Sequence, residues 1–144
     1  MTSTPRARAL VLATFIAALL HANTPALATG PNGFPLCTAT ADQISPVIVT
    51  DGSGGVIIAW HDHRPTVAAG GVTFAQRVSA GKVPQWAANG VALSTTGDPG
   101  NSTAARPAEP AIVEDGAHGA YVAYGGASAP PRVQWVNAAG VPQW

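Results

Sequence analysis

The amino-acid sequence predicts an all-β protein made of two antiparallel repeats, each with four short strands. The 16 glycines and 13 prolines lie between short apolar runs at regular spacing, as expected of many tight turns. These runs are rich in β-branched residues, which favours strands over helices. The third observation is that one pattern of residues occurs twice. Hydrophobic residues make up 47% of the chain, so both repeats can bury a core.

The repeat is clearest around a single aspartate. Residues 46–60 and 110–124 share a leading proline, an Asp-Gly step at Asp51 and Asp115, a later glycine and a closing aromatic residue. Other matched segments are 76–78 with 134–136, 83–86 with 141–144, and 32–37 with 89–94. The copies are offset by 57 residues at Asn32 and Asn89, by 64 at the aspartates and by 58 at Trp86 and Trp144. The length changes fall in Gly-, Pro- and Ala-rich stretches, where loops tolerate them.

Each repeat is predicted to begin with a hairpin. In the first copy the strands are 47–50 and 56–60, separated by a glycine-rich turn, and in the second they are 112–114 and 120–124. A third strand at 72–79 alternates, which places Val72, Phe74, Gln76 and Val78 on the only largely apolar face. A short strand at 91–93 completes the unit.

The N-terminal 28 residues have the three parts of a secretory signal peptide. Arg6 and Arg8 precede an apolar run of 12 residues at 9–20, and residues 26–28 supply a small-x-small cleavage site. The run is too short for a stable membrane span. We therefore expect a secreted or cell-surface protein with the signal peptide at 1–28, one repeat at 29–86 and a truncated repeat at 87–144.

Composition limits the partners and cofactors that we expect. Seven basic residues balance seven acidic ones, so nothing favours a nucleic acid partner. A disulfide would need a second cysteine, and Cys37 is the only one, so we interpret it as a small buried hydrophobic residue. Residues 51–55 offer one carboxylate, whereas calcium takes six to eight oxygen ligands. This segment is interpreted as a turn, and no cofactor or metal is expected.

A unit of about 57 residues with four short strands has the size of one blade of a β-propeller. Two units cannot close a ring, and the second copy stops before the counterpart of residues 89–94. The sequence therefore predicts two four-stranded antiparallel blade-like repeats of an incomplete β-propeller, a fragment of a longer array. Unpaired strand edges at both ends predict marginal stability and association through those edges.

The motifs resemble repeats of large exported bacterial proteins of the sialidase-like or Asp-box-like propeller superfamily. Trp60, Asp62 and Arg64 match the loop motif Trp-x-Asp-x-Arg, and residues 75–78 match the third strand. The second copy has Tyr-Gly-Gly-Ala at 124–127 in place of the loop motif. The resemblance covers nearly all of residues 32–144 and implies a propeller fold. The motifs mark a repeat and not an activity.

The strongest candidate for a binding loop is His61, Asp62, His63 and Arg64. Two histidines and one carboxylate fall short of the set of convergent ligands that a zinc or catalytic site needs. The alternative is a structural role, in which Asp62 and Arg64 pair or bond the loop backbone beside Trp60.

We expect a non-enzymatic secreted repeat module for binding or surface display, with carbohydrate or protein at the cell surface as a partner. The alternative is a fragment of a carbohydrate-active, sialidase-like glycoside hydrolase, which needs an arginine cluster, an acid and a tyrosine nucleophile. Residues of these types are Arg64, Arg77, Arg106, Arg132, Tyr121 and Tyr124, but their spacing does not bring them together. Trp86, Trp135 and Trp144 are either a sugar-stacking platform or core wedges.

Overall fold

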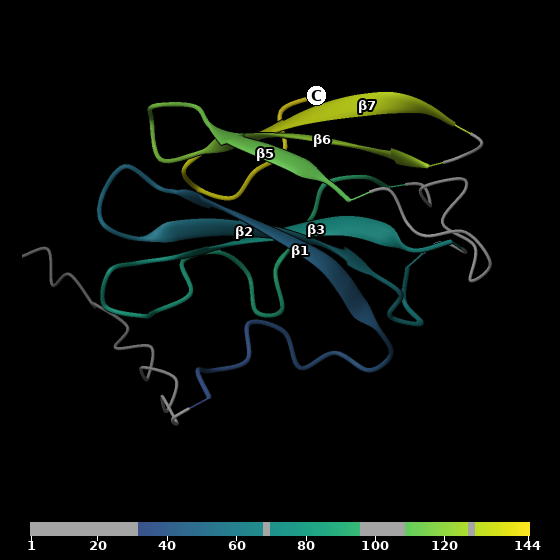
Figure 1. Ribbon diagram of the computed structural model, residues 1–144, viewed down its shortest axis with the longest axis horizontal. Helices are drawn as coiled ribbons and strands as arrows, with labels where there is room; N and C mark the ends of the chain where they lie inside the picture. Colours follow the sequence, from purple (N-terminus) through teal and green to yellow (C-terminus); the bar gives the residue numbers. More distant parts are fainter. Residues whose placement is uncertain (1–31, 68–69, 96–108, 127–128) are drawn as a thin grey trace, which may run out of the picture.

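Two antiparallel β-sheets packed face to face make up the computed structural model, which describes residues 32–67, 70–95, 109–126 and 129–144 (Figure 1). These residues contain no helix, which confirms the all-β prediction. The described part of the chain accordingly offers no helix with the length and apolarity to cross a membrane. The expected signal peptide, residues 1–28, lies outside the described residues.

The first sheet has four strands in the order β1-β2-β3-β4. They are β1 (Gln43–Thr50), β2 (Val56–Asp62), β3 (Val72–Val78) and β4 (Val91–Ala92). Their positions confirm the strands predicted for the first repeat. The glycine-rich turn between β1 and β2 is closed by a backbone hydrogen bond of 3.0 Å from Asp51 to Gly55, and glycine relieves the steric limits of such a turn.

The second sheet has three described strands in the order β5-β6-β7. They are β5 (Ala111–Glu114), β6 (Ala120–Gly126) and β7 (Ala129–Val136). The prediction of four strands in each repeat is therefore wrong for the second sheet as described. In the first repeat β4 follows Trp86, and the described residues of the second repeat contain no strand after β7.

The two repeats share their register as well as their residues. Ile58 lies opposite Gln76 in the first sheet, and Val122 lies opposite Gln134 in the second. Beyond the third strand of each sheet, isolated bridges join Val78 to Pro84 and Val136 to Pro142. The Val-Pro-Gln-Trp segment therefore folds back along the third strand in both units.

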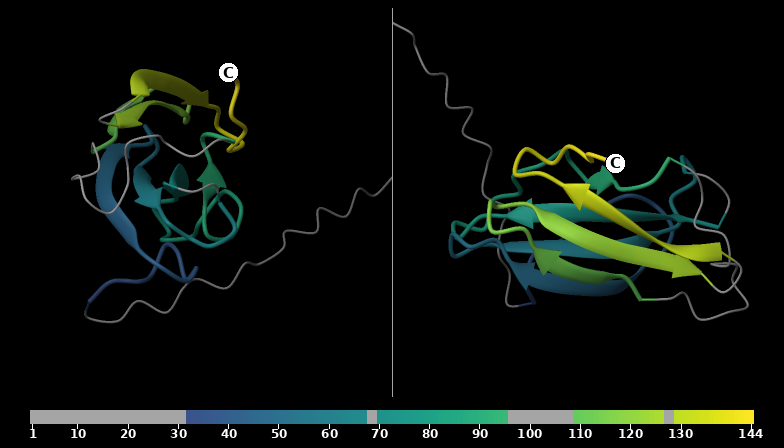
Figure 2. Two further views of the ribbon diagram at one scale, coloured as in Figure 1. Left: turned by 90° about the vertical axis from the view of Figure 1, so that its right-hand side faces the viewer. Right: turned by 90° about the horizontal axis from the view of Figure 1, so that it is seen from above.

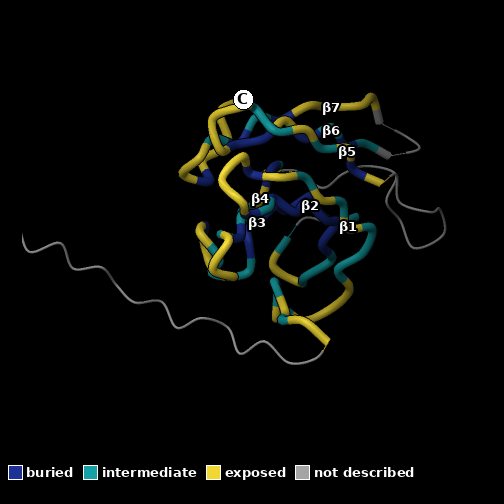
Figure 3. The backbone as a smooth tube through the Cα atoms, turned by 60° about the vertical axis from the view of Figure 1, so that its left-hand side comes forward, coloured by how far each residue is buried: buried dark blue, intermediate teal, exposed yellow. Residues whose placement is uncertain are grey.

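The larger core lies between the sheets, where the tube in Figure 3 is dark blue. It is formed by Ile57, Ala59, Ala75, Trp86, Leu93, Ala120, Val122, Tyr124 and Val136. The smaller core lies on the other face of the first sheet, where residues 34–37 cover Ile58, Trp60 and Phe74. Figure 2 shows this N-terminal segment on the side of the first sheet that faces away from the second.

Both faces of β3 are buried, although only one was predicted to be largely apolar. Val72, Phe74 and Val78 belong to the smaller core, as expected of the apolar face. On the opposite face Thr73 is 1% exposed and Ala75 is fully buried. The alternation in sequence could not indicate this, because the second sheet is what covers that face.

The two sheets stack in the same orientation. The first sheet presents Ile57 and Ala59 to the second, which presents Val122 and Tyr124 in return. Because Val122 and Tyr124 are the counterparts of Ile58 and Trp60, opposite faces of the repeat meet at this interface. The contact is thus head to tail between two copies of one unit.

Candidate functional site

The candidate binding residues lie at the end of β2 and directly after it. His61 and Asp62 are the last two residues of the strand and are 2% and 0% exposed. His63 and Arg64 follow and are half-buried. Half of the expected loop is therefore strand, and its carboxylate is shielded from solvent.

Asp62 and Arg64 form the ion pair that the sequence suggested. The Arg64 Nη2 atom lies 2.6 Å from Asp62 Oδ2, and Arg64 Nε donates to Asp62 Oδ1 at 2.9 Å. The indole N–H of Trp60 donates to the same carboxylate at 2.9 Å. Arg64 also stacks 3.8 Å above the Phe74 ring and donates to the backbone C=O of Asn89. The charged groups thereby fasten the loop to the smaller core.

Hydrogen bonding controls the charge state of this pair. Burial raises the pKa of the Asp62 carboxyl, but bonds from the Arg64 side chain, the Trp60 indole and the Arg64 backbone N–H outweigh it and lower the pKa to about 2. The bond to Asp62 in turn raises the pKa of Arg64. Both groups are therefore charged at neutral pH, and neither is poised to exchange a proton.

The two histidines contact each other at 4.8 Å between ring centroids, with the rings near perpendicular. The Nε2 atom of His61 lies 3.0 Å from the backbone C=O of Gly70. Within the described ranges, no three His, Cys, Asp or Glu side chains gather to hold a metal ion. Cys37, half-buried rather than buried, places its Sγ 3.4 Å from Arg64 Nη2. The contacts of the cluster hold the end of β2 against neighbouring parts of the first unit.

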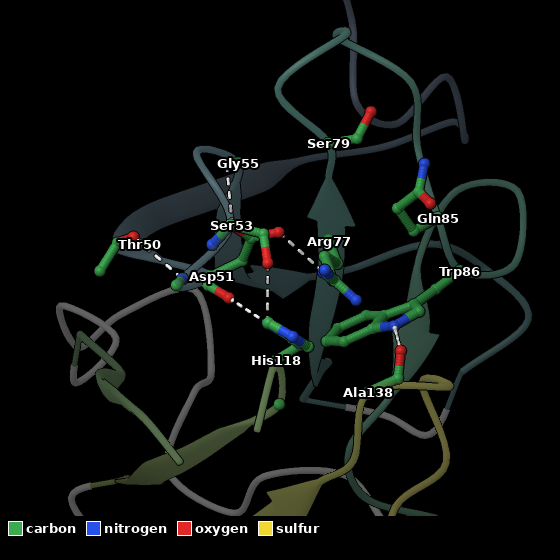
Figure 4. Close-up of polar contacts among 12 residues, drawn as sticks. Thr50, Asp51, Ser53, Gly55, Arg77, Ser79, Gln85, Trp86, His118 and Ala138 are labelled. Carbon is green, nitrogen blue, oxygen red and sulfur yellow. Dashed lines mark hydrogen bonds and ion pairs between the residues drawn. The ribbon is translucent and has the colours of Figure 1, made fainter. Parts of the chain in front are cut away.

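A second polar cluster surrounds the turn between β1 and β2 (Figure 4). The Asp51 Oδ1 atom accepts hydrogen bonds from the backbone N–H groups of Ser53 and Gly55, both at 2.8 Å. Its Oδ2 atom accepts from Arg77 Nε at 2.9 Å. Burial raises the pKa of Asp51, but the bonds from Ser53, Arg77 and Gly55 outweigh it and lower the pKa below its ordinary value. Asp51 is an Asx-turn residue here, as the sequence suggested.

The equivalent turn of the second repeat is built the same way with one exchange. Asp115 Oδ1 accepts from the N–H groups of Ala117 and Gly119, and Oδ2 accepts from the indole N–H of Trp135. Burial again raises the pKa of Asp115, and the bonds from Trp135, Ala117 and Gly119 lower it further than burial raises it. Trp135 is the counterpart of Arg77, so a neutral donor replaces a charged one.

Polar contacts also join the two units. The Nδ1 atom of His118 lies 2.8 Å from the backbone C=O of Asp51 and 3.0 Å from Ser53 Oγ. The indole N–H of Trp86 donates to the C=O of Ala138 at 3.0 Å (Figure 4). The turns of one unit thus anchor residues of the other at the same end of the stack.

The residue types that a sialidase-like site would need come together only in part, because Arg132 lies opposite Tyr124 in the second sheet while the others lie apart. Arg64 pairs with Asp62 at one end of the first sheet, and Arg77 pairs with Asp51 at the other. Tyr121 lies on the outer face of the second sheet, whereas Tyr124 lies on its inner face. Arg106 lies outside the described residues.

Of the three tryptophans considered for a platform, one is a core residue and one is exposed. Trp86 is 8% exposed and belongs to the core between the sheets, whereas Trp144 is 68% exposed. Trp144 lies 5.8 Å from Tyr121 and 6.3 Å from Trp135 between ring centroids. The sequence analysis did not place Tyr121 with these tryptophans. A signal was present, because Tyr121 is the repeat counterpart of the aliphatic residue Ile57.

An open groove of about 490 Å³ runs beside this aromatic cluster. It lies between the free edge of β7, at residues 132–134, and residues 92–95 of the first unit. Tyr124, Pro142 and Trp144 complete its walls. No sequence pattern indicated it, because its two walls come from different repeats.

Comparisons with protein-family models, with curated proteins and with solved structures found no match for this chain.

Proposed function

We propose that this chain is a non-catalytic, exported repeat module of an incomplete β-propeller, used for binding or surface display. The observation that carries the proposal is the matched structural use of the motif residues in both copies. Asp51 and Asp115 each bond two backbone N–H groups of their own turn. Residues that are repeated and bonded alike in each unit support a scaffold rather than a single catalytic centre.

The glutamines of the third strands support the same proposal. Gln76 Oε1 accepts from the backbone N–H of Trp86 at 2.9 Å, and Gln134 Oε1 accepts from that of Trp144 at 2.9 Å. Their Nε2 atoms donate to backbone C=O groups, in one case that of Ala87. Each glutamine thereby clasps the returning Val-Pro-Gln-Trp segment against its sheet.

The arrangement of the sheets is compatible with propeller blades. Small antiparallel sheets stacked face to face in one orientation are the way in which blades bury their surfaces. The repeat length of about 57 residues fits a four-stranded blade of this kind.

The alternative, a carbohydrate-active hydrolase, lacks a favourable observation. Arg64 and Arg77 are engaged in separate ion pairs. Arg132 and Tyr124 line one groove, but no Asp or Glu is among its described lining residues, and Tyr121 lies on the other face of the second sheet. Aromatic rings at Tyr121, Trp135 and Trp144 could stack on a sugar, but stacking supplies binding and not hydrolysis.

The proposal is tested by assaying the purified chain with aryl glycosides, aryl sialosides included. We expect no turnover above that of the buffer. Turnover that is lost in Arg64→Ala and Arg77→Ala, while circular dichroism shows both variants folded, would favour the hydrolase instead. Residues 1–28 fused to a reporter enzyme test export separately, and retention of the reporter in the cytoplasm would contradict it.

A further inference from the structure

Among the described residues, most of the exposed large hydrophobic side chains have a buried or half-buried counterpart in the other repeat. The exposed residues are Ile48, Val113, Tyr121, Val133, Val141 and Trp144. Five of the six have a repeat counterpart that is buried or half-buried in the interface between the two sheets. In the same order, leaving out Val141, these counterparts are Ile112, Val49, Ile57, Ala75 and Trp86.

The exposed residues form two faces. Val113, Tyr121, Val133, Trp135 and Trp144 lie on the outer side of the second sheet and are named the Trp144 face. Ile48 lies opposite Ile58 on the outer side of the first sheet, named the Trp60 face with Ile58, Trp60 and Phe74. Of these four residues only Ile48 is exposed, because residues 34–37 of the same chain already cover the others. The interface inside the chain joins one face of each kind, so the two outer faces are complementary by the same packing.

Residues 32–37 make only one of the two kinds of contact that the equivalent residues 89–94 make. Its counterpart, residues 89–94, pairs with β3 of its own unit and inserts Leu93 against the following unit, where Leu93 C=O accepts from Tyr124 and Gln134. Residues 34–37 pack likewise against the Trp60 face of the unit that follows them. The strand with which they would pair is the third strand of a preceding unit.

Backbone geometry supports this correspondence. Gly33 and Gly90 have φ values of +87° and +86°. A Cβ on Gly90 would meet Trp60 and the C=O of Ala75, whereas one on Gly33 would meet nothing within 4 Å. The counterparts of Trp60 and Ala75 are Tyr124 on β6 and Val133 on β7, and both line the groove beside β7.

The single proline of the segment is also compatible with pairing. Leu93 N–H donates to Thr73 C=O at 2.8 Å, so the alternation of antiparallel bonds turns the N–H of Ala92 away from β3. Pro35 is the counterpart of Ala92 and has no N–H to lose. A strand at residues 33–36 can therefore bond a neighbour on the side that β7 leaves open.

We infer that the chain assembles head to tail with a second copy of itself. Residues 33–36 of one copy enter the groove of about 490 Å³ and pair as the fourth strand with β7 of the other, Phe34 opposite Val133. The Trp60 face of the first copy then covers the Trp144 face of the second. This inference rests on the proposed stacking of repeats. It adds that the unit next to β7 belongs to a second copy of the chain.

The test uses two single-cysteine variants of the full chain, both with Cys37→Ser. One carries Phe34→Cys and the other Val133→Cys. Directly opposed residues of this hydrogen-bonded kind have Cα atoms about 5.5 Å apart, which suits a disulfide. Mixing the variants under mild oxidation is expected to give a covalent heterodimer. Phe34→Cys mixed with Ile48→Cys is the matched control and should not, because residue 48 lies at the far end of the partner.

Sedimentation of the uncrosslinked chain gives the second readout. We expect the mass to rise with concentration, and Val133→Pro to weaken association at least tenfold, since the N–H of residue 133 points away from β6. Val133→Lys should weaken association in the same way, and it keeps the backbone N–H of β7. A monomer at every concentration, or Val133→Cys homodimers in place of heterodimers, overturns the inference. Trp fluorescence that responds to cellohexaose or sialyllactose without any association would also overturn it and assign the face to sugar.

The two proposals fail in different ways. Absence of association together with absence of glycoside turnover removes the assembly and leaves the non-catalytic module standing. Turnover with intact association removes the proposed function and leaves the assembly.

Discussion

Asp51 and Asp115 occupy the same place in the two repeats and differ in their third partner. Both accept two backbone N–H groups of a glycine-rich turn. Asp51 is 1% exposed and holds the guanidinium of Arg77, whereas Asp115 holds the neutral indole of Trp135. One motif residue thus provides a matched comparison of charged and neutral bonding within one protein.

We predict that Asp51→Ala lowers the free energy of unfolding by roughly 3 kcal/mol, because it leaves a half-buried arginine unpaired. Asp115→Ala should cost about 1–2 kcal/mol, since it strands only neutral donors. Urea denaturation followed by circular dichroism measures both. Glu109→Ala, at an exposed position, is the control. Equal losses in the two aspartate variants would contradict the role given to Arg77.

The lowered carboxyl pKa values predict a loss of stability in acid. Asp62 has a folded pKa of about 2 against an ordinary value of 3.8, so the unfolded state takes up protons first as the pH falls. Its contribution is complete above the unfolded value and is lost between about pH 4 and pH 2. Asp51 and Asp115 shift in the same direction. Thermal unfolding over this range should show the midpoint falling, and less steeply in Asp62→Asn.

At the scale of elements, the segment that follows each returning tryptophan depends on a glycine with positive φ. Gly90 turns the chain from Trp86 into β4 and lies against Trp60 and the C=O of Ala75. Gly33 has the same backbone conformation, but a Cβ added there would meet nothing within 4 Å. Substituting these two glycines therefore separates two contributions to stability, the strain of positive φ and the steric crowding of a Cβ.

Gly90→Ala is expected to lower the free energy of unfolding by about 2–4 kcal/mol, from left-handed strain and from a Cβ 2.9 Å from the Ala75 C=O. Gly33→Ala should cost about 1 kcal/mol, the strain alone. Chemical denaturation at low protein concentration, where association does not contribute, compares them. A Gly33→Ala loss as large as that of Gly90→Ala would show that the space around Gly33 is not open.

For the whole molecule, the position of a unit in the stack decides whether a repeated tryptophan is core or surface. Trp86 is covered by the second unit, where Gly140 lets the indole approach the turn closely. Trp144 has the same place in its unit and is 68% exposed. The contact between the units therefore decides whether this repeated tryptophan is buried.

Trp86→Ala is expected to lower the free energy of unfolding by about 3–5 kcal/mol, because it opens a cavity between the sheets. Trp144→Ala should change it by less than about 1 kcal/mol in the monomer. Guanidinium denaturation at low protein concentration measures both. A large loss for Trp144→Ala under those conditions would mean that its ring supports the fold within one unit.

Much of the fold followed from local pattern. Glycine-rich turns between β-branched runs located the hairpins of both repeats, and the repeated Gln-x-Val segment placed the third strands. The predicted pairing of Asp62 with Arg64 needed only two complementary charged groups with a single residue between them. The second sheet has three described strands where four were predicted, because the described residues hold no counterpart of β4.

The sequence by itself determined the repeat, its strands and its turns, because these depend on neighbours a few residues apart. Only the tertiary structure decided which face of each sheet is covered, that Ala75 is buried where Val133 is 52% exposed, and that a groove separates β7 from residues 92–95. The physical reason is that equivalent residues carry the same local information in both repeats, whereas burial depends on which unit lies against them.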